Sequence, residues 1–261
     1  MKVSLIITTY NWKEALELSL LSGLGQKQKP IEIIVADDGS RPDTGEMIAE
    51  ISVQAPFPLI HSWQENKGFR LSASRNKAIA KTSGDYIVLI DGDIIMEKHF
   101  IADHIHFARS GCFVQGTRVL LKEELSKEVL TRKKMPGTLC KKGVENRKNC
   151  LRSGVLSRLL SFKNHGMSGV RTCNFAFWRK DALAVNGFNE DFVGWGREDS
   201  EFTARLLNYG LMRRNVKFSA LAYHLYHPRN DRSHLSENDH LLKETVQHKK
   251  VWCEKGVNAY L

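Results

Sequence analysis

Short apolar segments alternate with helical patterns over the first hundred residues, and this alternation constrains the fold more than any other feature. The expected strands are the β-branched, apolar runs over residues 3–8, 31–36, 59–63 and 86–90. The expected helices, with apolar side chains at helical spacing, cover residues 13–23, 44–52 and 71–81. Strands that alternate with helices are typical of a parallel sheet covered by helices. We therefore expect an α/β fold with a mostly parallel central sheet.

Polar and acidic residues follow three of these expected strands. They are Thr8-Thr9-Tyr10-Asn11, Asp37-Asp38-Gly39-Ser40 and Asp91-Gly92-Asp93. Right-handed crossovers place the ends of parallel strands along one edge, where α/β sheets bind ligands. Each segment alone is also typical of an ordinary turn, but together they predict one crevice. Carboxylates bind Mg²⁺ or Mn²⁺ and leave positions open for diphosphate oxygens, so the last segment predicts a metal-diphosphate site.

Two arginines lie near the start of the helix expected over residues 71–81. Arg70 precedes this helix and Arg75 lies within it. Backbone N–H groups at a helix start favour anions, and a guanidinium group fits phosphate oxygens in a bidentate manner. A surface arginine is usually only solvated, but two of them near the acidic segments indicate a phosphate-containing partner.

The second half of the chain is less regular. Residues 122–166 show no clear strand. The elements expected beyond residue 150 are an amphipathic helix over residues 151–162, a strand over 174–178, a helix over 198–209 and a strand over 216–223. No internal repeat or long linker divides the chain, so one domain with an inserted basic segment is the simplest description.

The net charge of +10 is concentrated in that basic segment. Residues 122–163 contain twelve Lys or Arg and four Glu. A basic surface attracts nucleic acids, anionic lipids or anionic substrates. Two uses of the segment stay open. It can form a lid over an acceptor site, or it can contact anionic membrane or a phosphorylated glycolipid through the helix expected over residues 151–162.

Several features of the sequence favour a cytoplasmic location. No apolar run approaches the ~20 residues that span a bilayer, and the N-terminus lacks a signal-peptide pattern. The five cysteines are scattered and form no Cys-x-x-Cys pair, which argues against disulfides or a zinc site. We therefore expect a cytoplasmic protein, and the membrane use of the basic segment would add a peripheral contact with the inner face of the cell membrane.

Residues 3–96 resemble the nucleotide-sugar half of glycosyltransferase family 2, which has the Rossmann-like GT-A fold. The resemblance is carried by Thr8-Thr9-Tyr10-Asn11, Asp37-Asp38-Gly39-Ser40, Arg70, Arg75-Asn76-Lys77-Ala78, and Asp85-Tyr86 through Asp91-Gly92-Asp93. It implies a single GT-A domain over residues 1–261. Residues 1–100 would bind the nucleotide sugar and residues 101–261 the acceptor, with a basic insertion at about residues 122–165.

The same resemblance implies roles for the residues of the first half. Thr8, Tyr10 and Asp38 would hold the base, usually uracil, and Arg70 would help to hold the diphosphate. Within Asp91-Gly92-Asp93, Asp93 would bind Mn²⁺ or Mg²⁺ directly, and Asp91 would lie nearer the ribose.

The acceptor side is expected in the segment Trp195-Gly196-Arg197-Glu198-Asp199. Trp195 offers a flat face for a sugar ring, and glycine lets the backbone come close to a ligand. Glu198 and Asp199 begin an expected helix, where acidic residues are common for structural reasons alone. Glycosyl transfer with inversion, however, needs a carboxylate that removes the proton of the acceptor hydroxyl.

This segment resembles the galactosyltransferase-type motif Trp-Gly-x-Glu-Asp. The motif is shared by β-1,4-galactosyltransferases, polypeptide N-acetylgalactosaminyltransferases and bacterial chondroitin polymerases. The resemblance implies that Asp199 is the catalytic base and that Glu198 contacts a sugar, beside Trp195 and Gly196. It also implies a downstream histidine on the metal, for which His224 is the first choice and His227 the second.

The two resemblances predict an inverting, metal-dependent glycosyltransferase. It would move a hexose or N-acetylhexosamine from a UDP-sugar to a glycan or glycolipid acceptor in surface polysaccharide or lipooligosaccharide synthesis, with a β-linked product. A nucleotidyltransferase would share the metal and nucleotide, but the chain lacks the glycine-rich, Arg-containing N-terminal loop of that chemistry. A nucleic-acid-binding protein would interleave aromatic and basic residues, whereas the basic segment has only Phe162. We therefore expect no nucleic-acid partner.

Overall fold

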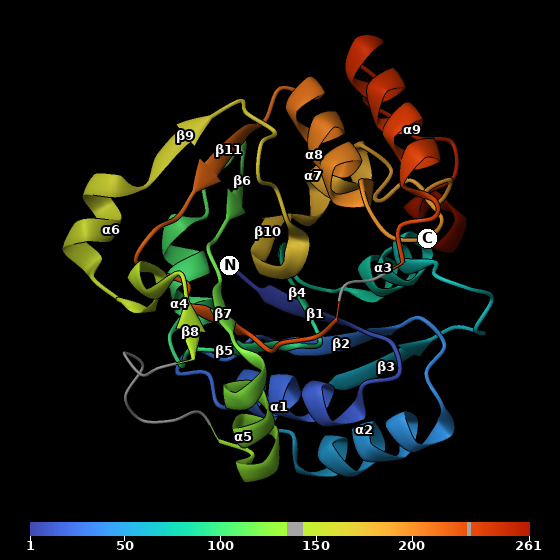
Figure 1. Ribbon diagram of the computed structural model, residues 1–261. Coiled ribbons are helices and arrows are strands. Elements are labelled where there is room, and N and C mark those ends of the chain that lie inside the picture. Colours follow the sequence, from blue (N-terminus) through green and yellow to red (C-terminus); the bar gives the residue numbers. More distant parts are fainter. Residues whose placement is uncertain (135–142, 229–230) are drawn as a thin grey trace.

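The computed structural model describes residues 1–134, 143–228 and 231–261 (Figure 1). Its α-helices are α1 (Lys13–Leu24), α2 (Pro42–Gln54), α3 (Leu71–Lys81), α4 (Phe100–Phe107), α5 (Glu123–Arg132), α6 (Gly154–Leu160), α7 (Arg179–Ala184), α8 (Glu198–Asn208) and α9 (Leu235–Gln247). Its strands are β1 (Val3–Thr9), β2 (Glu32–Asp37), β3 (Leu59–Trp63), β4 (Tyr86–Asp91), β5 (Ile94–Met96), β6 (Cys112–Gln115), β7 (Val119–Leu121), β8 (Val144–Glu145), β9 (Phe162–Asn164), β10 (Phe175–Trp178), β11 (Met212–Asn215) and β12 (Ala222–His224). Short 3₁₀ turns cover η1 (Arg147–Cys150), η2 (Thr172–Asn174) and η3 (Val257–Tyr260).

The larger sheet has the strand order β3-β2-β1-β4-β10-β6-β11-β9. Its N-terminal half, β3-β2-β1-β4, is parallel, as the sequence predicts. Thr8 pairs with Asp91 and Thr9 with Asp37 across β1. The ends of these three strands therefore lie side by side, and the predicted meeting of their polar segments is confirmed.

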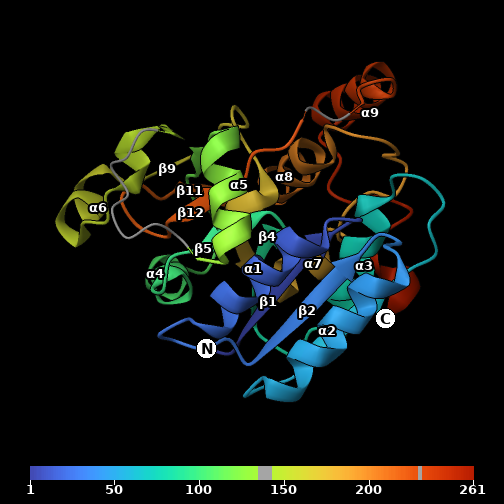
Figure 2. The ribbon, with the colours of Figure 1, turned by 60° about the horizontal axis from the view of Figure 1, so that its bottom comes forward.

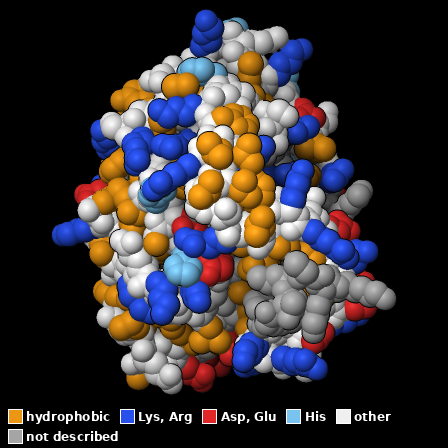
Figure 3. All heavy atoms as spheres, turned by 90° about the vertical axis from the view of Figure 1, so that its left-hand side faces the viewer, with side chains coloured by type: hydrophobic (Ala, Val, Ile, Leu, Met, Phe, Trp, Pro, Cys, Tyr) orange, Lys and Arg blue, Asp and Glu red, His pale blue; other side chains and the backbone are white. Residues whose placement is uncertain are grey.

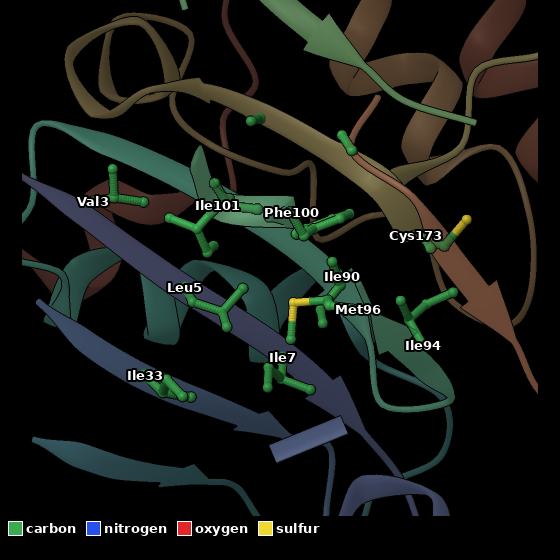
Figure 4. Close-up of a cluster of buried hydrophobic side chains, with 14 of the residues drawn as sticks. Val3, Leu5, Ile7, Ile33, Ile90, Ile94, Met96, Phe100, Ile101 and Cys173 are labelled. Atoms are coloured by element: carbon green, nitrogen blue, oxygen red, sulfur yellow. The ribbon is translucent and has the colours of Figure 1, made fainter. Parts of the chain in front are cut away.

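The alternating side chains of β1 divide the core between the two faces of the sheet. Leu5 and Ile7 pack on the face covered by α1, α2 and α4, whereas Ile6 packs toward α3, α7 and α8. Figures 1 and 2 show α1 and α2 lying together beside the parallel strands, and Figure 4 shows the side chains of Leu5, Ile7, Ile33 and Met96 in one cluster. Each such buried side chain contributes about 1.5–3 kcal/mol to the stability of the fold. The core therefore holds β1, β2 and β4 firmly, and the polar segments at the ends of these strands are fixed in place.

The second half of the larger sheet is mixed, because β10 runs antiparallel to both β4 and β6. A smaller sheet follows the order β5-β12-β7-β8. Within it, His224 of β12 pairs with Ile94 of β5, and the backbone N–H of Leu225 donates to the Asp93 carbonyl over 3.0 Å. This pairing brings the C-terminal part of the chain next to the acidic end of β4.

Three expectations for the second half are wrong or incomplete. Residues 216–221 do not continue a strand, because Phe218 and Ala220 have positive φ angles of 57° and 49°. Strands β8 and β9 occur inside the segment that shows no strand pattern. Helix α6 is shorter than residues 151–162, and it leaves Leu151 outside the helix. One of the five cysteines, Cys140, and two lysines of the basic segment, Lys141 and Lys142, lie outside the described residues. None of the described helices is both long and apolar enough to cross a bilayer.

Candidate active site

A crevice of about 1180 Å³ opens at the ends of β1 and β4 and extends to the start of α8. Nearly all of the residues predicted for the site line it, from both halves of the chain. They are Thr8, Tyr10, Asp38, Asp91, Gly92, Asp93, Trp195, Gly196, Glu198, Asp199, His224 and His227. One crevice therefore holds the donor-side and acceptor-side residues that the two resemblances predict separately.

Asp38, and not its neighbour Asp37, lines the crevice. Asp37 is fully buried and closes the turn, where it accepts from the Ser40 backbone N–H over 2.8 Å. Asp38 accepts from Gln64 Nε2 over 2.6 Å and from the Arg70 backbone N–H over 2.7 Å. Burial raises the pKa of Asp38, and these two donors oppose the rise. The donors fix the orientation of a carboxylate that faces the space beside Tyr10.

The predicted phosphate contact Arg70 does not line this crevice in the described structure. Its guanidinium Nη2 donates to the Glu65 carbonyl over 2.9 Å. A contact between Arg70 and a diphosphate would require this side chain to leave Glu65. The second arginine, Arg75, is the one that reaches the crevice.

Gly92 allows β4 to turn tightly against β1. Its backbone N–H donates to the Thr8 carbonyl over 2.7 Å, and a Cβ at this position would lie 2.7 Å from that same oxygen. A side chain does not fit there without displacement of β1. Thr8 adds a second tie, because its Oγ1 donates to Asp91 Oδ1 over 3.1 Å. The glycine thus keeps the carboxylates of Asp91 and Asp93 at the strand end.

Asp93, His224 and His227 form a cluster with the donor set of a divalent metal site. Nε2 of each histidine lies 3.4 Å from Asp93 Oδ2. Burial lowers the pKa of His224 to about 4, which keeps the imidazole neutral and able to bind a metal. Asp93 Oδ1 is buried without a hydrogen-bond partner in the described residues. Imidazole ligands suit transition-metal dications and the carboxylate suits Mn²⁺ as well, so of the two predicted ions these residues fit Mn²⁺ better than Mg²⁺.

Arg75 is a buried cation that joins the two ends of the crevice. Its Nη1 lies 2.9 Å from Asp199 Oδ1 and 3.6 Å from Glu198 Oε1, and its Nη2 lies 3.5 Å from Asp91 Oδ1. The side chain is 1% exposed and also stacks on the Phe188 ring. The sequence indicates a phosphate partner for Arg75, but its guanidinium is engaged with protein carboxylates.

The two acidic residues at the start of α8 differ in their surroundings. Both oxygens of Asp199 accept hydrogen bonds, Oδ1 from Arg75 and Thr172 Oγ1 and Oδ2 from the Thr172 backbone N–H. Glu198 Oε2 is buried and has no partner among the described residues. Burial, together with the nearby Asp199 charge, raises the pKa of Glu198 to about 7. The pair therefore combines a firmly held carboxylate with one that ionises near neutral pH.

Several residues of the site carry no recognisable signal in the sequence. They are Trp12 beside His227, Arg118 near the metal cluster, Thr172 under Asp199, and Arg232 over the Trp195 ring. Each is a single residue in an irregular segment or at an element's edge, so only the tertiary fold reveals its role. The sequence predicts His227 only as the second choice for the metal histidine, whereas the structure brings both His224 and His227 to Asp93.

Comparison with known proteins identifies the family of the chain. The sequence pattern described as glycosyl transferase family 2 matches residues 4–183. The chain belongs to this family. A second pattern, described as the N-terminal domain of galactosyltransferase, matches residues 155–228. The predicted family and transferase class are thereby confirmed.

Similar proteins in the family cover different shares of the chain. An uncharacterized glycosyltransferase of Bacillus subtilis, YfnE, is 31% identical, with 89% of this chain and 67% of that protein covered. A chondroitin synthase of Escherichia coli is 27% identical over 85% of this chain, which spans 34% of that synthase. The crystal structure of S. aureus TarS 1-349 superposes with a TM-score of 0.62 at 15% identity, and it covers 100% of this chain and 68% of that one. This match confirms the GT-A-like α/β fold.

Proposed function

We propose that this member of family 2 is an inverting, metal-dependent glycosyltransferase. It moves a hexose or N-acetylhexosamine from a UDP-sugar to a hydroxyl of a glycan or glycolipid, and the product is β-linked. The observation that carries the proposal is the single crevice that holds the Asp93–His224–His227 cluster at one end and Glu198–Asp199 at the other. Residues 1–261 then act as one GT-A domain, because both halves line that crevice.

The donor nucleotide binds along the ends of β1, β2 and β4. Asp38 accepts from a base N–H, and Tyr10 and Thr8 contact the base and its surroundings. Asp91 lies toward the ribose. Asp93, His224 and His227 would hold Mn²⁺ or Mg²⁺, which neutralises charge on the leaving diphosphate.

The acceptor side supplies the base for a single displacement. The acceptor hydroxyl oxygen bonds to the anomeric carbon, its proton passes to Asp199, and the bond from that carbon to the UDP oxygen breaks. Thr172 and Arg75 hold Asp199 in a fixed orientation for this transfer. Trp195 and Gly196 would contact the sugar. Glu198 is the second candidate base, since a pKa of about 7 suits general-base catalysis.

An exposed apolar surface on α6 and β9 supports a membrane-associated acceptor. Its side chains are 46–74% exposed. They comprise Val155, Leu159 and Leu160 of α6, Phe162 of β9, and Leu151 in the segment just before α6. Figure 3 shows hydrophobic side chains gathered on the face that carries these elements, with Lys and Arg around them. Apolar side chains within a basic surround fit an anionic lipid bilayer. The Leu159→Glu variant should sediment less with phosphatidylglycerol vesicles than the wild type, and unchanged sedimentation would contradict this contact.

The reaction is tested by UDP release across a panel of UDP-sugars with Mn²⁺, for the wild type and Asp199→Asn. We expect one sugar to be turned over, with loss in EDTA and a fall of roughly 10²–10⁴-fold in the variant. The matched control is Asp191→Asn, because Asp191 is an exposed aspartate eight residues before Asp199 that pairs with Lys255 and lies outside the crevice lining. An Asp199→Asn variant as active as this control would contradict the assigned base.

A further inference from the structure

A second, smaller cavity of about 240 Å³ lies beside the crevice. The ends of β6 and β11, the loop after β6, η1 and the residues before η2 line it. Four of its lining side chains are cationic, and none is acidic: Arg118, Arg171, Arg213 and Lys217. The remaining polar side chains are mainly amides, from Gln115, Asn146, Asn149 and Asn215. We name this cavity the basic pocket. Its lining suits an anion.

Arg213 is a buried cation that has no carboxylate partner among the described residues. This side chain is only 6% exposed, and burial lowers its pKa with no carboxylate to oppose the shift. Its Nη1 donates to the carbonyls of Gly166 and Ser168, whereas its Nε is buried without a partner in the described residues. The fully buried arginines Arg75 and Arg205 both pair with carboxylates. A buried, unpaired cation is costly, and a bound anion removes that cost.

The other cations of the basic pocket form no close ion pair among the described residues either. Within residues 1–134, 143–228 and 231–261, no ion pair at 4.0 Å or less includes Arg118, Arg171, Arg213 or Lys217. Arg171 and Lys217 are exposed at its mouth, so an incoming ligand can reach them. A guanidinium group binds phosphate oxygens in a bidentate manner, and arginine is the usual choice for such recognition. The chemistry therefore fits a phosphate group.

The position of the basic pocket relates it to the acceptor. It shares Arg118, Gly169, Arg171 and Cys173 with the crevice, so the two spaces adjoin. On its other side, the Lys217 ammonium lies 5.2 Å from the Phe162 ring, which belongs to the exposed apolar surface of α6 and β9. The pocket thus lies between the place of sugar transfer and an apolar surface.

We propose that the basic pocket binds a phosphate group of a phosphorylated glycolipid acceptor. The acceptor sugar extends into the crevice toward Asp199, and the lipid part lies over α6 and β9. This assignment rests on the proposed function, which it deepens by naming the acceptor class. Specificity for such acceptors then resides in Arg171, Arg213 and Lys217. Of these, Arg213 and Lys217 lie outside the lining of the donor crevice.

Binding of inorganic phosphate, measured by calorimetry without divalent metal, tests the pocket itself. The double variant Arg171→Ala/Lys217→Ala removes two exposed cations and leaves the buried Arg213 in place, so it should fold. We expect its phosphate affinity to fall about tenfold or more. The control variant Arg147→Ala/Lys148→Ala removes two exposed cations of η1 that do not line the pocket, and it should bind as the wild type does. The assignment would be overturned if both double variants lost phosphate affinity equally, or if neither of them lost any.

Two further probes distinguish an acceptor phosphate from a membrane headgroup. Octyl phosphate, as a monomer in solution, should bind the wild type and be displaced by inorganic phosphate, whereas octanol should not compete. A different pattern would identify a headgroup site and overturn the acceptor assignment. In that pattern octyl phosphate does not bind, phosphatidylglycerol vesicles bind the wild type, and the double variant no longer binds the vesicles. Metal-dependent UDP binding should be unchanged in the single variant Lys217→Ala, because Lys217 does not line the crevice. Absence of UDP binding in the wild type would instead refute the proposed function and leave the phosphate result intact.

Discussion

Removal of the Arg75 charge should destabilise the protein strongly, because three carboxylates depend on it. Arg75 is 1% exposed and lies 2.9–3.6 Å from oxygens of Asp91, Glu198 and Asp199. Loss of one partner of a buried ion pair costs about 3–5 kcal/mol, because the remaining charges stay buried. We expect Arg75→Met to lose that much unfolding free energy. For a chain of this size the loss corresponds to a fall in melting temperature of roughly 6–20 °C.

The loss should also depend on pH in a defined direction. Arg75 lowers the pKa of Glu198, which burial raises to about 7. Without Arg75 this pKa rises further. A carboxyl group with a pKa raised by folding binds protons more readily in the folded chain, so it destabilises the folded state increasingly up to that pKa. The difference between Arg75→Met and the wild type should therefore grow from pH 6 to pH 8.5.

Urea denaturation at these two pH values is the assay. Arg132→Met is the control, because Arg132 forms an exposed pair with Glu128 that contributes about 0–1 kcal/mol. If Arg75→Met does not fold at all, Arg75→Lys keeps the charge and should show a smaller loss of the same kind. A variant Arg75→Met within about 1 kcal/mol of the wild type at pH 8.5, or a pH-independent difference, would refute the reasoning.

Three other predictions address the crevice. Gly92→Ala should cost about 1–3 kcal/mol of unfolding free energy, because a Cβ there forces β1 and β4 apart. The control Gly154→Ala has open space around the added Cβ and should leave the unfolding free energy unchanged. Equal urea midpoints for the two variants would contradict this prediction. His224→Ala and His227→Ala should each weaken Mn²⁺ binding roughly tenfold or more in calorimetry, and an unaffected variant would exclude that histidine from the metal site. For Glu198, the second candidate base, the pKa of about 7 predicts that UDP release by the wild type rises between pH 6 and pH 8 and that Glu198→Gln flattens this rise. If Glu198→Gln shows the same rise, the pH dependence belongs to a titratable group other than Glu198.

The parallel half of the fold could be predicted from sequence because its signals are local and repeated. Each strand from β1 to β4 is an apolar run followed by a polar turn, and crossover handedness then fixes which ends meet. The strand-end residues of the crevice, such as Thr8, Asp38 and Asp93, follow from the same logic, whereas the roles of Asp199 and His224 come from the family resemblance. Asp38 could be preferred over Asp37 only through family resemblance, since burial of Asp37 in its turn is a tertiary property.

The parts that sequence reasoning misses depend on contacts between distant segments. Arg75 has no local feature that separates a carboxylate-bound arginine from a phosphate-binding one, because its partners lie in β4 and α8. Strands β8 and β9 are too short to show a period of two. The run Val216–Tyr223 has strand composition, but positive φ angles at Phe218 and Ala220 interrupt it. The apolar side of α6 was expected from its pattern, whereas its exposure is visible only in the folded chain.

Calorimetric titration of UDP, with and without Mn²⁺, tests the central claim that this crevice is a metal-dependent nucleotide site. The wild type should bind UDP with Mn²⁺ and lose most of that affinity in EDTA. The variant Asp93→Asn should lose the metal-dependent part, because Asp93 contributes the carboxylate of the cluster with His224 and His227. UDP binding that is equal with and without metal, or that Asp93→Asn leaves unchanged, would contradict the account.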